Sequence, residues 1–276
     1  MKKIYIILLF TFSIAIISSC HKSDSDKDHE TQSTSDNALA ESCWNDIFKQ
    51  MDDASAVTLD VNRYSNSVHT ATCYSINVNP ALPDTTFPKL VTLDFGTTNC
   101  TGPDGINRRG IITAVFTGKY RDSNTTITIT TNNYFVNDYK VTGTKTITNL
   151  GHINGVMTYS INVSNAVITS PANKTISWNS ARTRRWIAGE STPLIVSDDV
   201  YEITGNANGT GTNGNTFTAT ITTPLRIQMN CYYIVSGVLK LTPANLADRI
   251  IDFGSGTCDD DATVSILGKS YSIKLH

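Results

Sequence analysis

The sequence predicts an all-β fold, a predominantly antiparallel meander or sandwich preceded by one short helix. Three observations carry this prediction. The composition leans to Thr, Asn, Ser, Gly, Ile and Val, with little Glu or Lys, as in proteins built from many short strands and tight turns. From about residue 55 onward, apolar and polar residues alternate in short runs separated by turn signals. The first and last parts of this region also repeat each other in sequence.

The chain opens with an export signal. Two lysines precede an apolar stretch, residues 4–17, which is shorter than the roughly 20 residues that a bilayer-spanning helix needs. Residues Ile17-Ser18-Ser19-Cys20 resemble a lipobox, whose cysteine receives a diacylglycerol and becomes the mature N-terminus. The resemblance implies a signal peptide over residues 1–19 and a lipid attached to Cys20. Two or three acyl chains on one cysteine would hold the protein firmly at the membrane.

Residues 20–36 are expected to form the lipidated cysteine and a disordered polar tether. Residues 21–36 include no apolar side chain, so ordering them would gain no hydrophobic free energy. Acidic residues close behind Cys20 resemble the signal that exports Bacteroidota lipoproteins to the outer face of the outer membrane. We therefore expect an outer-membrane protein exposed at the cell surface, with a periplasmic orientation as the alternative.

A helix is predicted over residues 37–54, with Asp36 as its cap. Its apolar residues recur at spacings of three and four, which places them on one stripe: Leu39, Cys43, Trp44, Ile47, Phe48 and Met51. Such a stripe usually packs on a core, although it could also bind a partner. We expect it to pack on the β domain that follows, residues 55–276.

Short alternating runs place the strands of that domain. They cover residues 71–78, 90–94, 110–120, 125–132, 140–149, 155–163, 175–186, 199–205, 216–222, 231–241 and 263–275. Asn137-Asp138, Asn154-Gly155 and Asn213-Gly214 are typical of hairpin turns, where positive φ is needed.

An internal repeat, residues 73–117 and 231–275, flanks a central meander over residues 118–230. A shift of 158 residues aligns Cys73-Tyr74-x-Ile76 with Cys231-Tyr232-x-Ile234, Asp94-Phe95-Gly96 with Asp252-Phe253-Gly254, Cys100 with Cys258, and Gly110 with Gly268. Each Asp-Phe-Gly triplet is interpreted as structural, with Phe in the core, Gly in a turn and Asp accepting a local hydrogen bond. The terminal segments should therefore be pseudo-symmetric.

The repeated cysteines predict disulfides, because an exported protein meets an oxidising compartment. Four cysteines allow three connectivities. The equal separation of 27 residues within each copy favours Cys73 with Cys100 and Cys231 with Cys258 over pairing across copies. Cys43 is left over on the buried helical stripe, where an inert thiol is favoured over an intermolecular bridge or a nucleophile.

Charge and motifs exclude several classes of protein. Without residues 1–19 the chain keeps 20 basic and 24 acidic residues, a net charge of −4, whereas a nucleic-acid-binding face would require a basic excess. The histidines outside the tether are His69, His152 and His276, and the sequence has no nucleophile elbow, zincin motif or phosphate loop. We predict no catalytic activity, no metal and no cofactor.

Two groups of acidic residues are candidate sites. A glycosidase needs two carboxylates facing each other across a cleft, and the best set is Glu190 and Glu202 with Asp198 and Asp199 between them. Turn and salt-bridge roles are favoured for these four. The loops 101–105 and 259–261 are expected to be solvated turns rather than calcium sites, because three adjacent aspartates cannot all aim at one ion.

The run 175–186 supplies the candidate ligand face. A period of two places Trp178, Arg182, Arg184 and Trp186 on one side of a strand. Two flat aromatics and two guanidiniums suit stacking on sugar rings and hydrogen bonds to hydroxyl or acidic groups. In the alternative, the tryptophans belong to the core and the arginines pair with acidic side chains.

The mature chain as a whole resembles a family of Bacteroidota lipoproteins with a lipobox, an acidic tether and repeated Asp-Phe-Gly-x-x-x-Cys segments. The resemblance implies no activity. We expect a structural or binding lipoprotein held at the membrane through Cys20, with a polysaccharide or another surface protein as partner. A glycan-binding accessory protein is the first alternative, and an unrecognised hydrolase is the second.

Overall fold

The computed structural model describes residues 28, 30–59, 73–81, 83–192, 195–231 and 233–275. The predicted signal peptide, Cys20 and tether residues 21–27 lie outside this described part, as do His69 and His276. Their roles therefore stay predictions.

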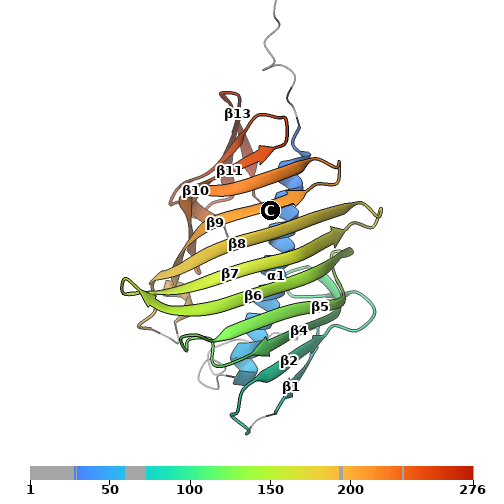
Figure 1. Cartoon of the computed structure of the whole chain (residues 1–276), viewed down its shortest axis with the longest axis vertical. Coiled ribbons are helices and arrows are strands. Elements are labelled where there is room, and N and C mark those ends of the chain that lie inside the picture. The colour runs from blue at the N-terminus through green and yellow to red at the C-terminus, as the bar shows by residue number, and fades with distance from the viewer. Residues whose placement is uncertain are drawn as a thin grey trace, which may run out of the picture.

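One antiparallel sheet makes up most of the fold, which confirms the all-β prediction (Figure 1). Its strands pair in chain order as a meander, except that β3 pairs beside β4, and the terminal strands β1 and β14 of the described part do not pair with each other. The strands are β1 (Ser75–Asn79), β2 (Lys89–Asp94), β3 (Cys100–Thr101), β4 (Asn107–Phe116), β5 (Thr126–Val136), β6 (Tyr139–Ile153), β7 (Val156–Thr169), β8 (Thr175–Ala188), β9 (Val200–Thr210), β10 (Thr216–Gln228), β11 (Ile234–Pro243), β12 (Arg249–Ser255), β13 (Asp261–Ile266) and β14 (Lys269–Lys274).

The helix α1 (Gln32–Leu59) runs across the strands and contacts β2, β4, β8 and β10 (Figure 1). We call the face of the sheet that packs on α1 the inner face, and the opposite one the outer face. Cys43, Trp44, Ile47 and Met51 are at most 3% exposed, so the predicted stripe does pack on the β domain.

The helix begins earlier than predicted. It starts at Gln32 rather than residue 37, and Asp36 lies buried inside it instead of capping it. The Glu30 carboxylate caps the first turn by accepting from the Ser33 N–H at 2.7 Å, and Asp36 accepts from the Thr212 N–H at 2.7 Å. The end of the predicted tether is therefore ordered, because specific hydrogen bonds hold a segment that has no apolar side chain.

Irregular strand pairing lets the sheet curl around the helix. Gly110, Gly143, Gly205 and Gly237 have positive φ and lie at register shifts in β4, β6, β9 and β11. Such bulges bend a strand and increase its twist. A Cβ on Gly143 would lie 2.8 Å from the Cα of Ala166 and 2.9 Å from the Trp44 ring, so the close approach of helix and sheet requires glycine there.

The repeat is confirmed at its disulfides and triplets. Cys73 is bonded to Cys100 and Cys231 to Cys258, as predicted. The Asp94 carboxylate accepts from the Gly96 N–H at 2.8 Å, and Asp252 accepts from Gly254 at 2.9 Å. Both phenylalanines of the triplets are buried, and both glycines have positive φ.

Strand pairing departs from the sequence repeat. Asp94 lies opposite Ser75, but Asp252 lies opposite Val238, five residues beyond the position that the 158-residue shift gives for Ser75. Gly110 forms a bulge within β4, whereas Gly268 lies in the turn between β13 and β14. The pseudo-symmetry therefore holds for the disulfide and the triplet, but it extends neither to the register with the strand before them nor to the strand after them.

Candidate functional site

The predicted Trp and Arg face exists, but it is the inner face. Trp178, Trp186 and Arg182 are only 2%, 3% and 7% exposed. The Trp178 indole donates to the Asn37 side chain of α1 at 3.0 Å, and the Trp186 indole donates to Asp199 at 3.2 Å. An exposed ligand platform on these residues is therefore wrong, because α1 covers the side of β8 on which they lie.

Arg184 is enclosed by aromatic rings. Its guanidinium carbon lies 4.9 to 5.8 Å from the ring centroids of Phe48, Tyr120, Tyr159 and Tyr201. Burial lowers the pKa of Arg184 from its ordinary value. Cation–π contacts of this kind stabilise a desolvated cation by about 2 kcal/mol. The side chain therefore links three strands to the helix.

Other cations of the inner face contact carboxylates or a backbone carbonyl of α1. Arg108 of β4 forms ion pairs with Asp46 of the helix and with Asp104, the latter at 2.7 Å. Arg182 of β8 lies 3.3 Å from Glu41. Lys145 of β6 donates to the Trp44 carbonyl at 3.1 Å, and burial lowers the pKa of Lys145 to about 8. These groups hold the helix on the sheet.

The predicted carboxylate set is dispersed over separate contacts. Glu190 lies 2.7 Å from the His152 ring, and Glu202 pairs with Arg185 at 3.2 Å. Asp198 accepts from the Thr192 hydroxyl at 2.6 Å. Asp199 is buried under Trp186, and burial raises its pKa. Each carboxylate thus has a local partner, in agreement with the turn and salt-bridge roles favoured from sequence.

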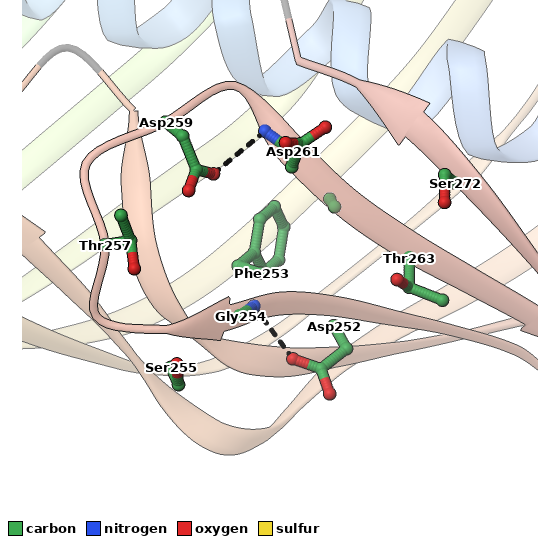
Figure 2. Close-up of a pocket in the computed structure, with 10 residues that line it drawn as sticks. Asp252, Phe253, Gly254, Ser255, Thr257, Asp259, Asp261, Thr263 and Ser272 are labelled. Atoms are coloured by element: carbon green, nitrogen blue, oxygen red, sulfur yellow. Dashed lines mark hydrogen bonds between the residues drawn. The ribbon is translucent and has the colours of Figure 1, made fainter.

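The acidic loop after β12 borders an open depression of about 550 Å³. Figure 2 shows the carboxylates of Asp252, Asp259 and Asp261 spread around its rim rather than converging. Asp259 accepts from the Asp261 N–H at 3.0 Å, and Lys274 pairs with Asp260 and Asp261 at 2.6 and 2.9 Å. Within the described ranges, no group of three His, Cys, Asp or Glu residues is placed to hold a metal ion.

The outer face carries ordered rows of uncharged polar side chains. One row crosses six strands, and its members lie opposite one another in sequence order: Asn77, Thr92, Thr113, Thr130, Thr144 and Ser164. A second row crosses β5 to β10 and comprises Thr128, Thr146, Asn162, Asn206 and Thr220, with the apolar Ala181 of β8 interrupting it between the two asparagines. Neighbouring strands lie about 4.8 Å apart, so hydroxyl and amide groups repeat closely along each row.

A second open depression, of about 490 Å³, lies on the outer face where these strands approach their turns. Arg109, Phe135, Lys140 and Thr169 line it and lie opposite one another on β4, β5, β6 and β7. The Arg109 guanidinium lies 3.8 Å from the centroid of the Phe135 ring.

Sequence reasoning did not identify the outer-face rows or this depression. The alternation of Thr within residues 125–131 and 142–148 was a signal for the rows. The depression had no comparable signal, because its residues come from four strands whose register is fixed only in the fold.

Comparisons with protein-family models, curated proteins and solved structures find no match. In the part of the chain that the structure describes, no helix is both long enough and apolar enough to cross a membrane.

Proposed function

We propose that the protein is a lipid-anchored outer-membrane lipoprotein exposed at the cell surface, with a structural or binding role rather than a catalytic one. The lipobox at residues 17–20 supports the anchor, and the polar rows of the outer face support a binding role. The observation that carries the proposal is that the chain enters the domain at one end of the sheet, at Asp28, only eight residues after Cys20.

The entry is fixed by Arg249 of β12, whose side chain is fully buried. Its guanidinium donates to Asp28 at 2.6 and 2.8 Å and to the Glu30 carbonyl at 2.6 Å. Asp28 follows Cys20 by eight residues, which span at most about 28 Å when fully extended. A lipid on Cys20 would therefore keep this end of the sheet close to the membrane and leave the far end, with β1 and β2, pointing away (Figure 1).

The test of anchoring is the substitution Cys20→Ala. It should abolish lipid labelling and release the protein from the membrane fraction, whereas Cys43→Ala, which removes the buried thiol, should leave the fractionation unchanged. Retention of the Cys20→Ala protein in membranes would contradict the proposal. Surface exposure is tested separately by adding protease to intact cells. The protease should remove the domain if it is exposed at the surface.

Glycan binding is the second candidate, favoured by the uncharged hydroxyl and amide rows of the outer face. These groups can exchange hydrogen bonds with the hydroxyls of a sugar chain without burying a charge. A glycan array probed with the soluble domain tests it, and binding of at least one glycan class is expected. The domain should begin at His21, because a start at Asp36 would remove the partners of Arg249.

A further inference from the structure

We propose that the depression lined by Arg109, Phe135, Lys140 and Thr169 binds an acidic sugar residue of a polysaccharide. This inference rests on the glycan-binding candidate above. It adds a site, a charge and a class of ligand to that candidate, and each comes from a different property of the depression.

The charge comes from Lys140. The ion pair of this region joins Arg109 to Asp138 and leaves Lys140 out. Asp138 is the one carboxylate among the described lining residues, and the neighbouring Arg109 guanidinium neutralises it and lowers its pKa. Arg109 is also held by the Asn99 side chain at 2.5 Å. A net positive charge therefore remains at Lys140, where it complements a carboxylate or sulfate group.

The neighbouring side chains suit a sugar ring. Phe135 and Pro171 give the depression apolar surface, against which the C–H groups of a pyranose can pack. The Arg109 guanidinium over the Phe135 ring holds that ring in place. Thr169, Ser170 and Asn173 add hydroxyl and amide groups at the edge, and these can bond to sugar hydroxyls.

The surface beyond the depression favours a polymer over a small anion. Along β6, the residues after Lys140 that share its face are threonines: Thr142, Thr144, Thr146 and Thr148. Residues on one face of a strand recur about every 7 Å, so these hydroxyls continue from Lys140 into the polar rows. A chain with one acidic residue in the depression would lie over this uncharged surface.

The experiment measures binding of the soluble domain, begun at His21, to polygalacturonate, dextran sulfate and amylose by affinity electrophoresis. We expect retardation by polygalacturonate that weakens as salt is raised. Lys140→Glu should reduce the affinity about fivefold or more, and Lys140→Arg should retain it. Lys119→Glu is the charge-matched control, because Lys119 lies in the β4–β5 turn at the opposite end of these strands. Equal thermal unfolding of the variants establishes that they are folded.

The outcomes separate the two proposals. Retardation by dextran sulfate that also depends on Lys140 supports the site and extends it to sulfated sugars. Equal losses in Lys140→Glu and Lys119→Glu would overturn it in favour of diffuse charge attraction. Retardation by amylose alone, unaffected by Lys140→Glu, would overturn the acidic site and leave glycan binding standing. No retardation by any of the three, with a negative glycan array, would overturn both.

Discussion

At the scale of the residue, burial decides what each charged or aromatic side chain does. Trp178, Arg182 and Lys145 all belong to types that bind ligands when exposed, yet here they face α1 and are at most 7% exposed. Their hydrogen bonds end on the helix: the Asn37 side chain, Glu41 and the Trp44 carbonyl. The same chemistry that suggested a ligand face from sequence therefore fastens the helix instead.

Lys145 should make stability depend on pH. Its pKa falls from 10.5 to about 8 on folding, because burial disfavours the charged amine, while Glu41 opposes this effect. Between pH 8 and 10.5 the unfolded chain binds more protons at this site, so stability rises with pH there, by an amount on the order of 3 kcal/mol.

The check is urea unfolding of wild type and Lys145→Met at pH 7 and pH 10. The methionine variant should be more stable than wild type at pH 7, and this advantage should shrink at pH 10. An identical pH dependence of the two proteins would contradict the prediction.

The two tryptophans of β8 should contribute to the stability of the fold. Trp178→Ala and Trp186→Ala should each lower the free energy of unfolding by about 3 to 5 kcal/mol, because each leaves a cavity in the buried core. Ser177→Ala, a substitution on the exposed face of the same strand, should change it by less than about 0.5 kcal/mol. Thermal and urea unfolding of the three variants measures this, and near-wild-type stability of both Trp variants would refute it.

At the scale of the element, α1 and the curled sheet depend on each other. The bulge at Gly143 brings β6 against Trp44, and the Arg108 and Lys145 side chains reach the same stretch of helix. A flat sheet would contact a straight helix along a narrow line only. The 28 residues of α1, about 42 Å, are long enough to cross the strands from β2 to β10, and curvature widens its contact with each strand.

Gly143→Ala should be strongly destabilising, by about 3 kcal/mol. The new Cβ would meet the Ala166 backbone and the Trp44 ring at under 3 Å, in a backbone conformation of φ +137° that only glycine adopts easily. Gly155→Ala separates the two causes, since its φ is +77° but nothing lies within 4 Å of the added carbon. It should cost only about 1 kcal/mol. Equal losses in the two variants would show that helix packing is not the cause.

The sequence predicts those features of the fold that depend on local interactions, and it misses those that depend on distant contacts. Periodicity, turn residues and equal cysteine spacing act locally, and they correctly predicted the meander, the helical stripe and both disulfides. The start of the helix was predicted too late, because its first turn depends on Glu30, Thr212 and Arg249, which only the fold brings together. The sequence also did not predict which side of β8 is covered by α1. A period of two places residues on one face of a strand but does not say whether that face is buried.

At the scale of the whole molecule, the link between Asp28 and Arg249 joins the first described residue to one of the last strands. The guanidinium holds the pKa of Asp28 below its usual range, and the arginine side chain is fully buried. The link therefore closes the domain across 221 residues of sequence. Removing one partner of a buried ion pair lowers the free energy of unfolding more than replacing both partners by apolar residues does.

Asp28→Asn should lower the free energy of unfolding by about 3 to 5 kcal/mol, because the buried Arg249 charge keeps only the Glu30 carboxylate, 3.4 Å away, as an anionic partner. The double variant Asp28→Asn with Arg249→Met should recover part of that loss. Asp248→Asn breaks an exposed pair with Lys240 and should cost at most about 1 kcal/mol. Chemical unfolding of the four proteins, wild type included, gives the comparison. A double variant less stable than Asp28→Asn would contradict the buried-charge explanation.

The entry of the chain beside Arg249 also has a mechanical consequence. In a protein anchored through Cys20 as proposed, a force between the membrane and a ligand on the sheet would pass first through the contacts of Asp28. It would then pass along α1, whose contacts with Arg182, Lys145 and Arg108 follow one another down its length. A pull on the anchor would break these contacts one after another from the N-terminal end of the helix, rather than all at once. The first contact to be loaded is the ion pair between Asp28 and Arg249, which is the most deeply buried pair described here. Resistance to unfolding by force would therefore be greatest where the pull begins.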